Sequence, residues 1–65
     1  MKYSMVIKWS DEDNAYVVFF PEWSEGPVTD GATYEEAAEK GAAVLETFIE
    51  VAKQDGRPFP QPQVA

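Results

Sequence analysis

The chain has 65 residues, with twelve acidic and five basic side chains and a formal net charge of -7. Phosphate contacts need clustered cations, so this balance argues against nucleic acid as a direct partner and favours a basic protein. Cysteine and histidine are absent, which excludes disulfides, cysteine-based metal sites and imidazole ligands. No apolar run approaches the roughly 20 residues of a membrane span, and the N-terminus lacks a signal-peptide pattern. The sequence predicts one small cytoplasmic domain without cofactors.

Three strands are predicted before any helix. Apolar and polar residues alternate over residues 2–10, which is typical of a strand with one apolar face. The polar run at 11–14 suits a hairpin turn. Residues 15–20 are almost all apolar, so we expect a central strand with one face on a helix and the other in need of cover. Residues 28–31 are predicted to form a short edge strand.

One long helix is predicted over residues 33–55. Thr33 and Glu36 have the spacing of a capping box, in which each side chain accepts the backbone N–H of the other residue. Gly56 is the expected left-handed cap residue, and Pro58 prevents the helix from resuming. Apolar residues fall on one face and glutamates on the opposite face, so the helix should lie on the sheet. Small residues around Gly41 predict a close backbone approach there.

The predicted fold class is α+β, with a three-stranded antiparallel sheet in the order β-β-β-α and one long helix packed on one face. Residues 57–65 contain three prolines and are expected to form an extended tail or a short C-terminal edge strand with limited hydrogen bonding. Residues 1–65 should form a single domain. A chain this small buries only about 60% of its unfolded surface, so we expect it to gain stability as a homodimer or higher homo-oligomer.

Motifs at the joints between these elements indicate a family. Pro21-Glu22 closes the second strand, Thr-Asp-Gly-Ala-Thr-Tyr-Glu-Glu-Ala at 29–37 opens the helix, and Gly-Arg-Pro-Phe-Pro follows it at 56–60. Their order and spacing resemble the HicB-like antitoxin domain over nearly the whole chain. The chain departs from the family pattern at 23–27, where Leu-Pro-Gly-Cys is usual, and at Ala32, where an acidic residue is common.

The resemblance implies a truncated ribonuclease H-like fold and a non-catalytic antitoxin. Its partner would be a small basic mRNA-cleaving toxin of the HicA type, neutralised by direct binding that masks the RNA-binding face. Full-length family members usually add a DNA-binding domain, and we expect none in this chain. The alternative is an orphan HicB-fold protein with a regulatory or scaffolding partner, and the sequence does not separate the two.

Candidate binding residues fall into two groups. Partner binding is predicted for acidic and aromatic residues in the loop after the second strand and on the outer helix face: Glu22, Trp23, Glu25, Glu35 and Glu39. Packing over the sheet edge and a solvated helix face are the plainer alternatives. A 22-residue helix, about 33 Å long, outruns a strand of about 20 Å, so a second copy could cover the excess apolar surface. The predicted dimer interface consists of Tyr16, Val18, Phe20, Phe48, Ile49 and Val51.

Two further hypotheses involve chemistry or RNA. Asp11, Glu12 and Asp13 could hold a divalent metal as a nuclease does, but they lie in a predicted turn and no acidic residue in the first two strands completes a site. We therefore predict no enzymatic activity and no bound metal. Three aromatic residues, Trp9, Tyr16 and Phe20, could stack nucleotides, but interleaved cations are missing, which favours core or dimer packing.

Overall fold

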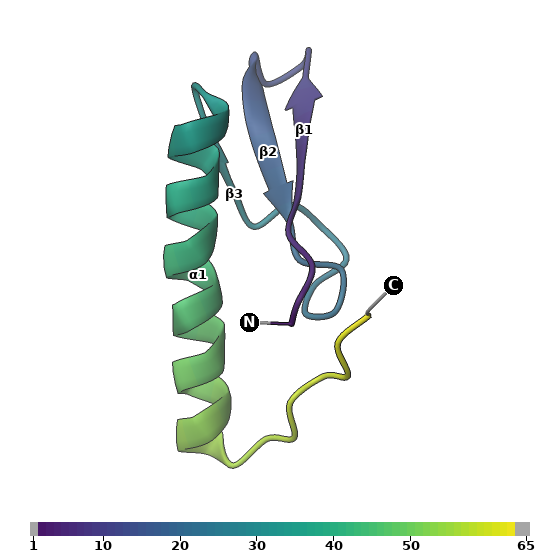
Figure 1. Ribbon diagram of the computed structural model, residues 1–65, viewed down its shortest axis with the longest axis vertical. Coiled ribbons are helices and arrows are strands. Elements are labelled where there is room, and N and C mark those ends of the chain that lie inside the picture. Colours follow the sequence, from purple (N-terminus) through teal and green to yellow (C-terminus); the bar gives the residue numbers. More distant parts are fainter. Residues whose placement is uncertain (1, 64–65) are drawn as a thin grey trace.

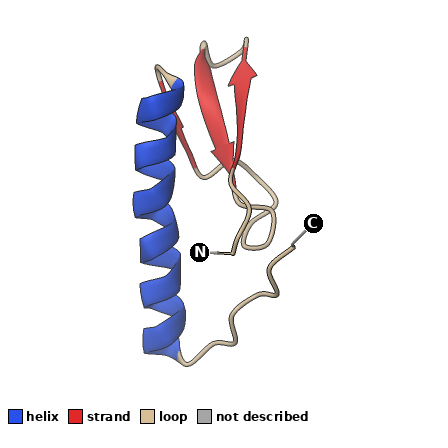
Figure 2. Cartoon of the chain, viewed as in Figure 1, coloured by secondary structure: helices blue, strands red, loops and turns tan. Residues whose placement is uncertain are grey.

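The computed structural model describes residues 2–63, which form three strands followed by one helix (Figure 1). The strands β1 (Val6–Ser10), β2 (Ala15–Phe19) and β3 (Thr29–Gly31) make an antiparallel sheet in the order β1-β2-β3. The helix α1 (Tyr34–Asp55) runs along one face of this sheet (Figure 2). The α+β class and the order β-β-β-α are therefore confirmed.

The first strand is shorter than predicted. Its ladder with β2 begins at the pair Val6 and Phe19 and ends at Ser10 and Ala15. Continuing the same register would place Ser4 opposite Pro21, which has no N–H to donate. The N–H of Ser4 instead donates to the carboxylate of Glu22, 3.1 Å from each oxygen. Alternation of side chains does not reveal where the partner strand stops.

The turn between β1 and β2 forms as predicted. Asn14 adopts a left-handed backbone with φ of 51°, which asparagine tolerates better than most residues. The hydroxyl of Ser10 donates to Asp13 Oδ2 at 3.0 Å and accepts from the N–H of Asp13 at 3.3 Å. These local bonds close the hairpin and fix the register of β1 on β2.

The N-terminus of α1 is capped by Thr33, whose hydroxyl accepts the N–H of Glu36 at 3.0 Å. The other half of the predicted capping box does not form in the described structure. The Glu36 carboxylate pairs with Lys40 at 3.2 Å, one turn further along the helix. A carboxylate at this position has two competing partners, and spacing alone does not decide between them.

The C-terminus of α1 also ends where predicted. Gly56 is left-handed with φ of 67°, and its N–H donates to the carbonyl of Lys53 at 3.3 Å. The N–H of Arg57 donates to the carbonyl of Ala52 at 3.0 Å, which completes a Schellman motif. Both helix ends are thus closed by short-range bonds.

The core lies between α1 and the sheet and is centred on β2. Val18, Phe20 and Ala37 are completely buried, and Leu45 is nearly so. The small half of the helix lets it approach the sheet closely, since a Cβ on Gly41 would lie 3.0 Å from Val18 Cγ1. The predicted close approach at Gly41 is confirmed.

The helix extends well beyond the strands, as predicted from its length (Figure 1). Two segments of the same chain accompany its free end: the loop after β2 and the tail, residues 57–63, which turns back from the helix. No part of 57–63 is a strand, because prolines 58, 60 and 62 cannot donate to a ladder. The last two residues of the predicted tail, 64 and 65, lie outside the described residues.

Candidate functional site

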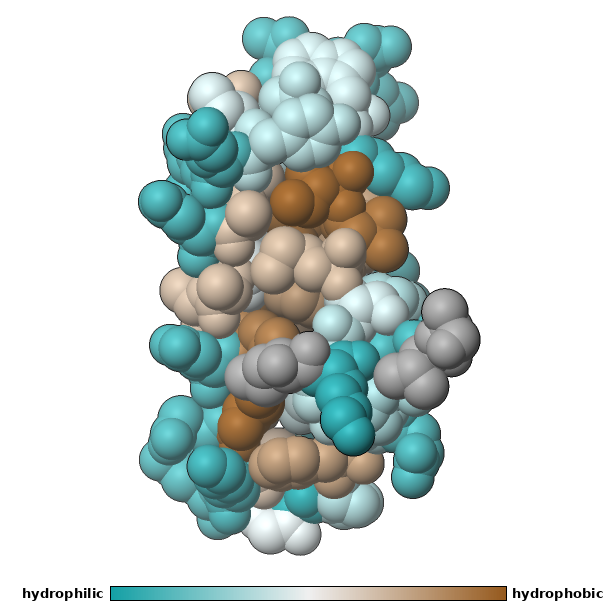
Figure 3. All heavy atoms as spheres, in the orientation of Figure 1, coloured by the Kyte–Doolittle hydropathy of each residue, from teal (hydrophilic) through white to brown (hydrophobic). Residues whose placement is uncertain are grey.

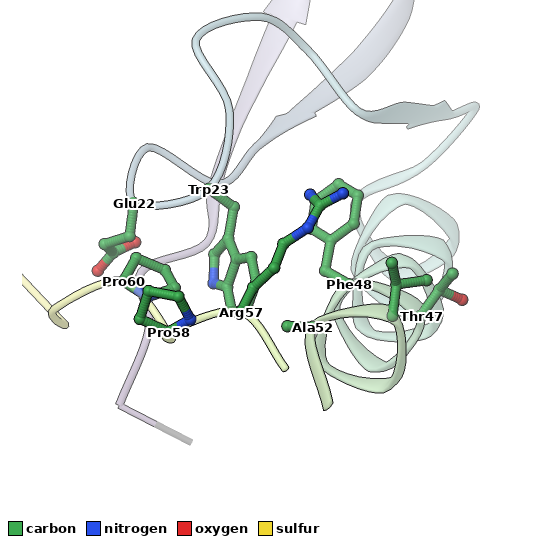
Figure 4. A pocket seen from close by; sticks show the side chains of 9 residues that line it. Glu22, Trp23, Thr47, Phe48, Ala52, Arg57, Pro58 and Pro60 are labelled. Carbon is green, nitrogen blue, oxygen red and sulfur yellow. The ribbon is translucent and has the colours of Figure 1, made fainter. Parts of the chain in front are cut away.

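A pocket of about 560 Å³ lies at the free end of α1, between the helix, the loop after β2 and the tail (Figure 4). We call it the terminal pocket. Its apolar lining comes from Trp23, Phe48, Val51, Pro58 and Pro60. In Figure 3 the brown apolar band that separates helix from sheet continues down to this end of the molecule.

Trp23 forms the central wall of the terminal pocket. Its indole stacks on Phe48, with ring centroids 5.8 Å apart, and meets the edge of Tyr3 at 5.2 Å and the ring of Phe59 at 6.1 Å. Its Nε1 is buried and has no hydrogen-bond partner among residues 2–63. Trp23 therefore packs on its own helix end, and not over the sheet edge.

Glu22 ties the tail to the start of the chain. Its carboxylate accepts the N–H of Gln63 at 2.9 Å, the N–H of Ser4 at 3.1 Å and the Ser4 hydroxyl at 3.2 Å. The hydroxyl of Tyr3 also donates to the carbonyl of Pro60 at 2.9 Å. Chiefly the Gln63 N–H, helped by Ser4, lowers the pKa of Glu22 below its ordinary value of 4.5. This predicted partner-binding carboxylate is already engaged within the chain.

Acid is expected to release the tail. The pKa of Glu22 is lower in the folded protein than in the unfolded chain. The ionised carboxylate therefore contributes fully to the stability of the folded state above pH 4.5. That contribution is lost as the pH falls through the lower folded pKa. In an amide NMR titration, the Gln63 and Ser4 signals should therefore move together with a midpoint below 4.5.

Glu22→Gln should give the released tail signals already at neutral pH, because a neutral amide is a weaker acceptor than a carboxylate. Glu25→Gln is the matched control, since Glu25 lies three residues away and is exposed. If both variants keep the neutral-pH signals of Gln63, Glu22 does not hold the tail.

The outer face of α1 carries four glutamates and, in its last turn, Lys53. Glu35, Glu39, Glu46 and Glu50 are all exposed, and their spacing places them within an arc of about 60°. Within residues 2–63, the ion pairs join Lys40 to Glu36 and Arg57 to Asp55, so none involves these four glutamates.

The predicted partner-binding residues do not form one surface. Glu22 and Trp23 lie by the free end of α1, whereas Glu35 and Glu39 lie at its beginning. Glu25 lines a separate hollow of about 350 Å³ with Val6 and Phe19 on the other face of the sheet.

The predicted dimer interface requires a correction on β2. Val18 and Phe20 are fully buried by the chain's own helix and have no surface to offer a second copy. Tyr16, on the same face, is half-buried, as are Phe48 and Ile49 on the helix, while Val51 is 43% exposed. The register places Val6, Val17 and Phe19 on the sheet face opposite α1. Both faces of this strand are apolar, so composition does not reveal which one meets the helix.

The acidic turn does not gather a metal site. Asp11 accepts the indole N–H of Trp9 at 2.7 Å, and Asp13 accepts the hydroxyl of Ser10. Within residues 2–63 there is no group of three or more acidic side chains able to hold a metal ion. The proposed nucleotide-stacking set is also divided, because Phe20 is buried in the core.

An exposed aromatic cluster lies at the hairpin end of the sheet, and the sequence did not predict it as a unit. Trp9 and Tyr16 meet edge to face with centroids 5.0 Å apart, and Tyr16 and Tyr34 meet at 4.2 Å. Tyr34, the first residue of α1, is 58% exposed, and Trp9 is 47% exposed. The signal that could have found the cluster is the pairing of Trp9 with Tyr16 across a four-residue turn.

Within residues 2–63, the helix is not apolar enough to cross a membrane.

Comparisons with known proteins found no relative of this chain. No family model matches the chain, and no curated protein or solved structure does so either.

Proposed function

We propose that this chain is a non-catalytic HicB-like antitoxin module, acting in the cytoplasm, which neutralises a small basic mRNA-cleaving toxin of the HicA type by direct binding. The motifs at 21–22, 29–37 and 56–60 support this family, and the observed order β-β-β-α agrees with it. The observation that carries the proposal is the exposed glutamate stripe on α1 in a chain of net charge -7. Such a surface is complementary to a basic RNA-binding face.

The mechanism is electrostatic steering followed by masking. Carboxylates without cationic partners attract a basic toxin over a screening length of about 8 Å at physiological salt, and they raise the rate of encounter. Once bound, the antitoxin occupies the surface that the toxin uses for RNA phosphates. Association should therefore slow steeply as salt increases, while dissociation changes less.

The same proposal includes a homodimer through the open sheet face. Lys8, Val17 and Asp30 form one row across β1, β2 and β3 on that face. If two sheets pack face to face about a two-fold axis parallel to the strands, Lys8 of each copy lies over Asp30 of the other. Val6 and Phe19, which are partly exposed on that face, would form the apolar centre, whereas Val17 is only 8% exposed in the single chain and adds little further burial.

One purification tests both parts. We expect the small basic protein encoded beside this gene to co-purify with the chain, and light scattering of the free chain to give the mass of two subunits. Glu35→Lys with Glu39→Lys should slow association at least tenfold, because steering depends on local charge. Glu46→Lys with Glu50→Lys makes the same change in net charge further along the helix and should slow it less.

Three results would count against the proposal. Lack of binding by the unmutated chain, or lack of such a neighbour, removes the antitoxin function and favours the orphan alternative. A one-subunit mass at micromolar concentration removes the homodimer. If the two double variants slow association equally, steering depends on the net charge of the chain and not on Glu35 and Glu39.

A further inference from the structure

We infer that the cluster of Trp9, Tyr16 and Tyr34 is the docking site for an arginine side chain of the basic partner. This inference rests on the proposed function only in taking the partner to be a basic protein. It assigns a specific contact to a surface that lies far from the terminal pocket. The pale patch at the upper end of Figure 3 covers the hairpin end of the sheet and the start of α1, where these residues lie.

The three rings make a continuous aromatic surface. Trp9 comes from β1, Tyr16 from β2 and Tyr34 from the first turn of α1, so three different elements converge. Consecutive ring centroids are 5.0 Å and 4.2 Å apart. Tyr16 is half-buried between the others, while about half of each outer ring faces solvent. A surface of this kind loses more water on binding than scattered apolar residues do.

The cluster is held in place by contacts within the chain that leave about half of Trp9 and of Tyr34 exposed. Asp11 accepts the Trp9 indole N–H at 2.7 Å, so the edge of the indole is fixed. Tyr16 is opposite Gly31, whose missing side chain lets the first turn of α1 come close and brings Tyr34 onto the Tyr16 ring. The cluster is therefore built before any partner arrives, which reduces the entropy lost on binding.

The charges around the cluster select a cation. Four exposed carboxylates are close in sequence to the outer rings. Asp11, Glu12 and Asp13 lie in the turn that follows Trp9, and Glu35 follows Tyr34. Lys8 is adjacent to Trp9 in sequence but lies on the other sheet face. Lys40 is engaged by Glu36. Aromatic faces attract cations, and neighbouring carboxylates add to that attraction.

Arginine suits this site better than lysine or a nucleotide. Its planar guanidinium can stack on an aromatic face and still donate hydrogen bonds to a nearby carboxylate such as Asp11. A nucleotide would also stack, but its phosphate would approach four carboxylates. The contact thus favours a basic partner that presents an arginine side chain on its surface.

The first experiment uses a defined probe and does not need the toxin. An arginine-rich nonapeptide is titrated into the 15N-labelled chain, with the same peptide in citrulline as the neutral control. The Trp9 indole N–H signal should shift and saturate with the arginine peptide only, while the signal of the Trp23 indole N–H, whose Nε1 is buried, should not move. An RNA single strand of similar length serves as the third probe and should leave Trp9 unchanged.

Matched variants separate ring, charge and fold. Trp9→Leu and Tyr34→Leu should each weaken arginine-peptide binding about tenfold, whereas Tyr34→Phe keeps the ring and should bind as the unmutated chain does. Phe59→Leu removes an aromatic ring of similar exposure, 45%, in the tail and should have no effect. Asp11→Asn should weaken peptide binding more than Asp55→Asn does. Asp55→Asn also removes one negative charge, but at the last residue of α1, far from the cluster. Amide spectra confirm that each variant is folded.

The second experiment repeats these variants with the neighbouring basic protein. A tenfold loss of affinity with Trp9→Leu and Tyr34→Leu, without loss in Phe59→Leu, supports the inference. Equal toxin binding by all variants overturns it and leaves the antitoxin function intact. Peptide shifts spread over many carboxylates, without a saturating Trp9 signal, overturn it as well. So does RNA binding at Trp9 tighter than that of the arginine peptide.

A saturating peptide site at Trp9, combined with no toxin binding by the unmutated chain, separates the two claims in the other direction. The arginine site then stands, and the antitoxin function falls.

Discussion

Phe20→Ala is expected to remove a large share of the chain's free energy of unfolding. Phe20 directly follows β2, is completely buried, and meets Phe48 edge to face with centroids 6.4 Å apart. Its carbonyl also accepts the N–H groups of Trp23 and Ser24 at 2.9 Å, so it anchors the loop that reaches the terminal pocket. Truncating a buried phenylalanine to alanine costs about 3 to 5 kcal/mol. A 65-residue chain has only about 3 to 10 kcal/mol of stability in total.

Urea denaturation followed by circular dichroism measures this effect. Phe20→Leu is the matched control, because it keeps most of the buried volume and should lose much less stability. Both should be compared at one protein concentration, since a dimer makes apparent stability depend on concentration. An alanine variant less than about 1 kcal/mol below the unmutated chain would show that Phe20 is not central to the core.

Gly31→Ala adds only one methyl group, and we expect it to destabilise the fold strongly. A Cβ at Gly31 would lie 2.5 Å from the backbone nitrogen of Ala37 and 2.9 Å from its Cα. Both belong to the first turn of α1, which cannot retreat without pulling on the Thr33 cap. Overpacking of this kind costs about 1 to 3 kcal/mol, and more where backbone must move. We expect β3 to separate from α1 and the ring of Tyr34 to leave Tyr16.

Gly26→Ala is the matched control, because a Cβ there meets nothing within 4 Å. It should change stability by no more than about 0.5 kcal/mol, or stabilise slightly through the unfolded chain. Thermal unfolding gives the stabilities, and the amide signals of residues 29–31 report on β3 directly. Equal stability of the two glycine variants would contradict the close contact between β3 and the helix.

The helix ends could be predicted from the sequence because their signals are local. The Thr33 cap and the Gly56 turn depend on atoms within a few residues of one another, and any chain with that spacing can form them. The same holds for the hairpin at 11–14 and for the central strand. Gly41 also predicts its close contact with the sheet. A glycine inside a helix lowers helix stability relative to alanine, and close packing is what offsets that loss.

Some residues of the candidate site could be predicted from the sequence, but their contacts could not. Trp23, Glu22 and the helix glutamates were predicted as binding residues from residue type, yet Trp23 and Glu22 satisfy contacts within the chain. The aromatic cluster was missed because its rings come from three different elements, and Tyr34 at the start of α1 stays 58% exposed. A helical period identifies a face, and it does not reveal how far the opposing sheet extends.

What the sequence alone determined is the element order, both ends of α1, the turn after β1 and an acidic surface, since each depends on composition or on neighbours along the chain. Only the tertiary structure decided where β1 starts, which apolar face of β2 meets the helix, and that the tail returns to Glu22. The physical reason is that these outcomes depend on partners many residues away, such as Glu22 for the N–H of Ser4 and Gln63 for the carboxylate of Glu22. Competition between such partners is resolved only when the whole chain packs.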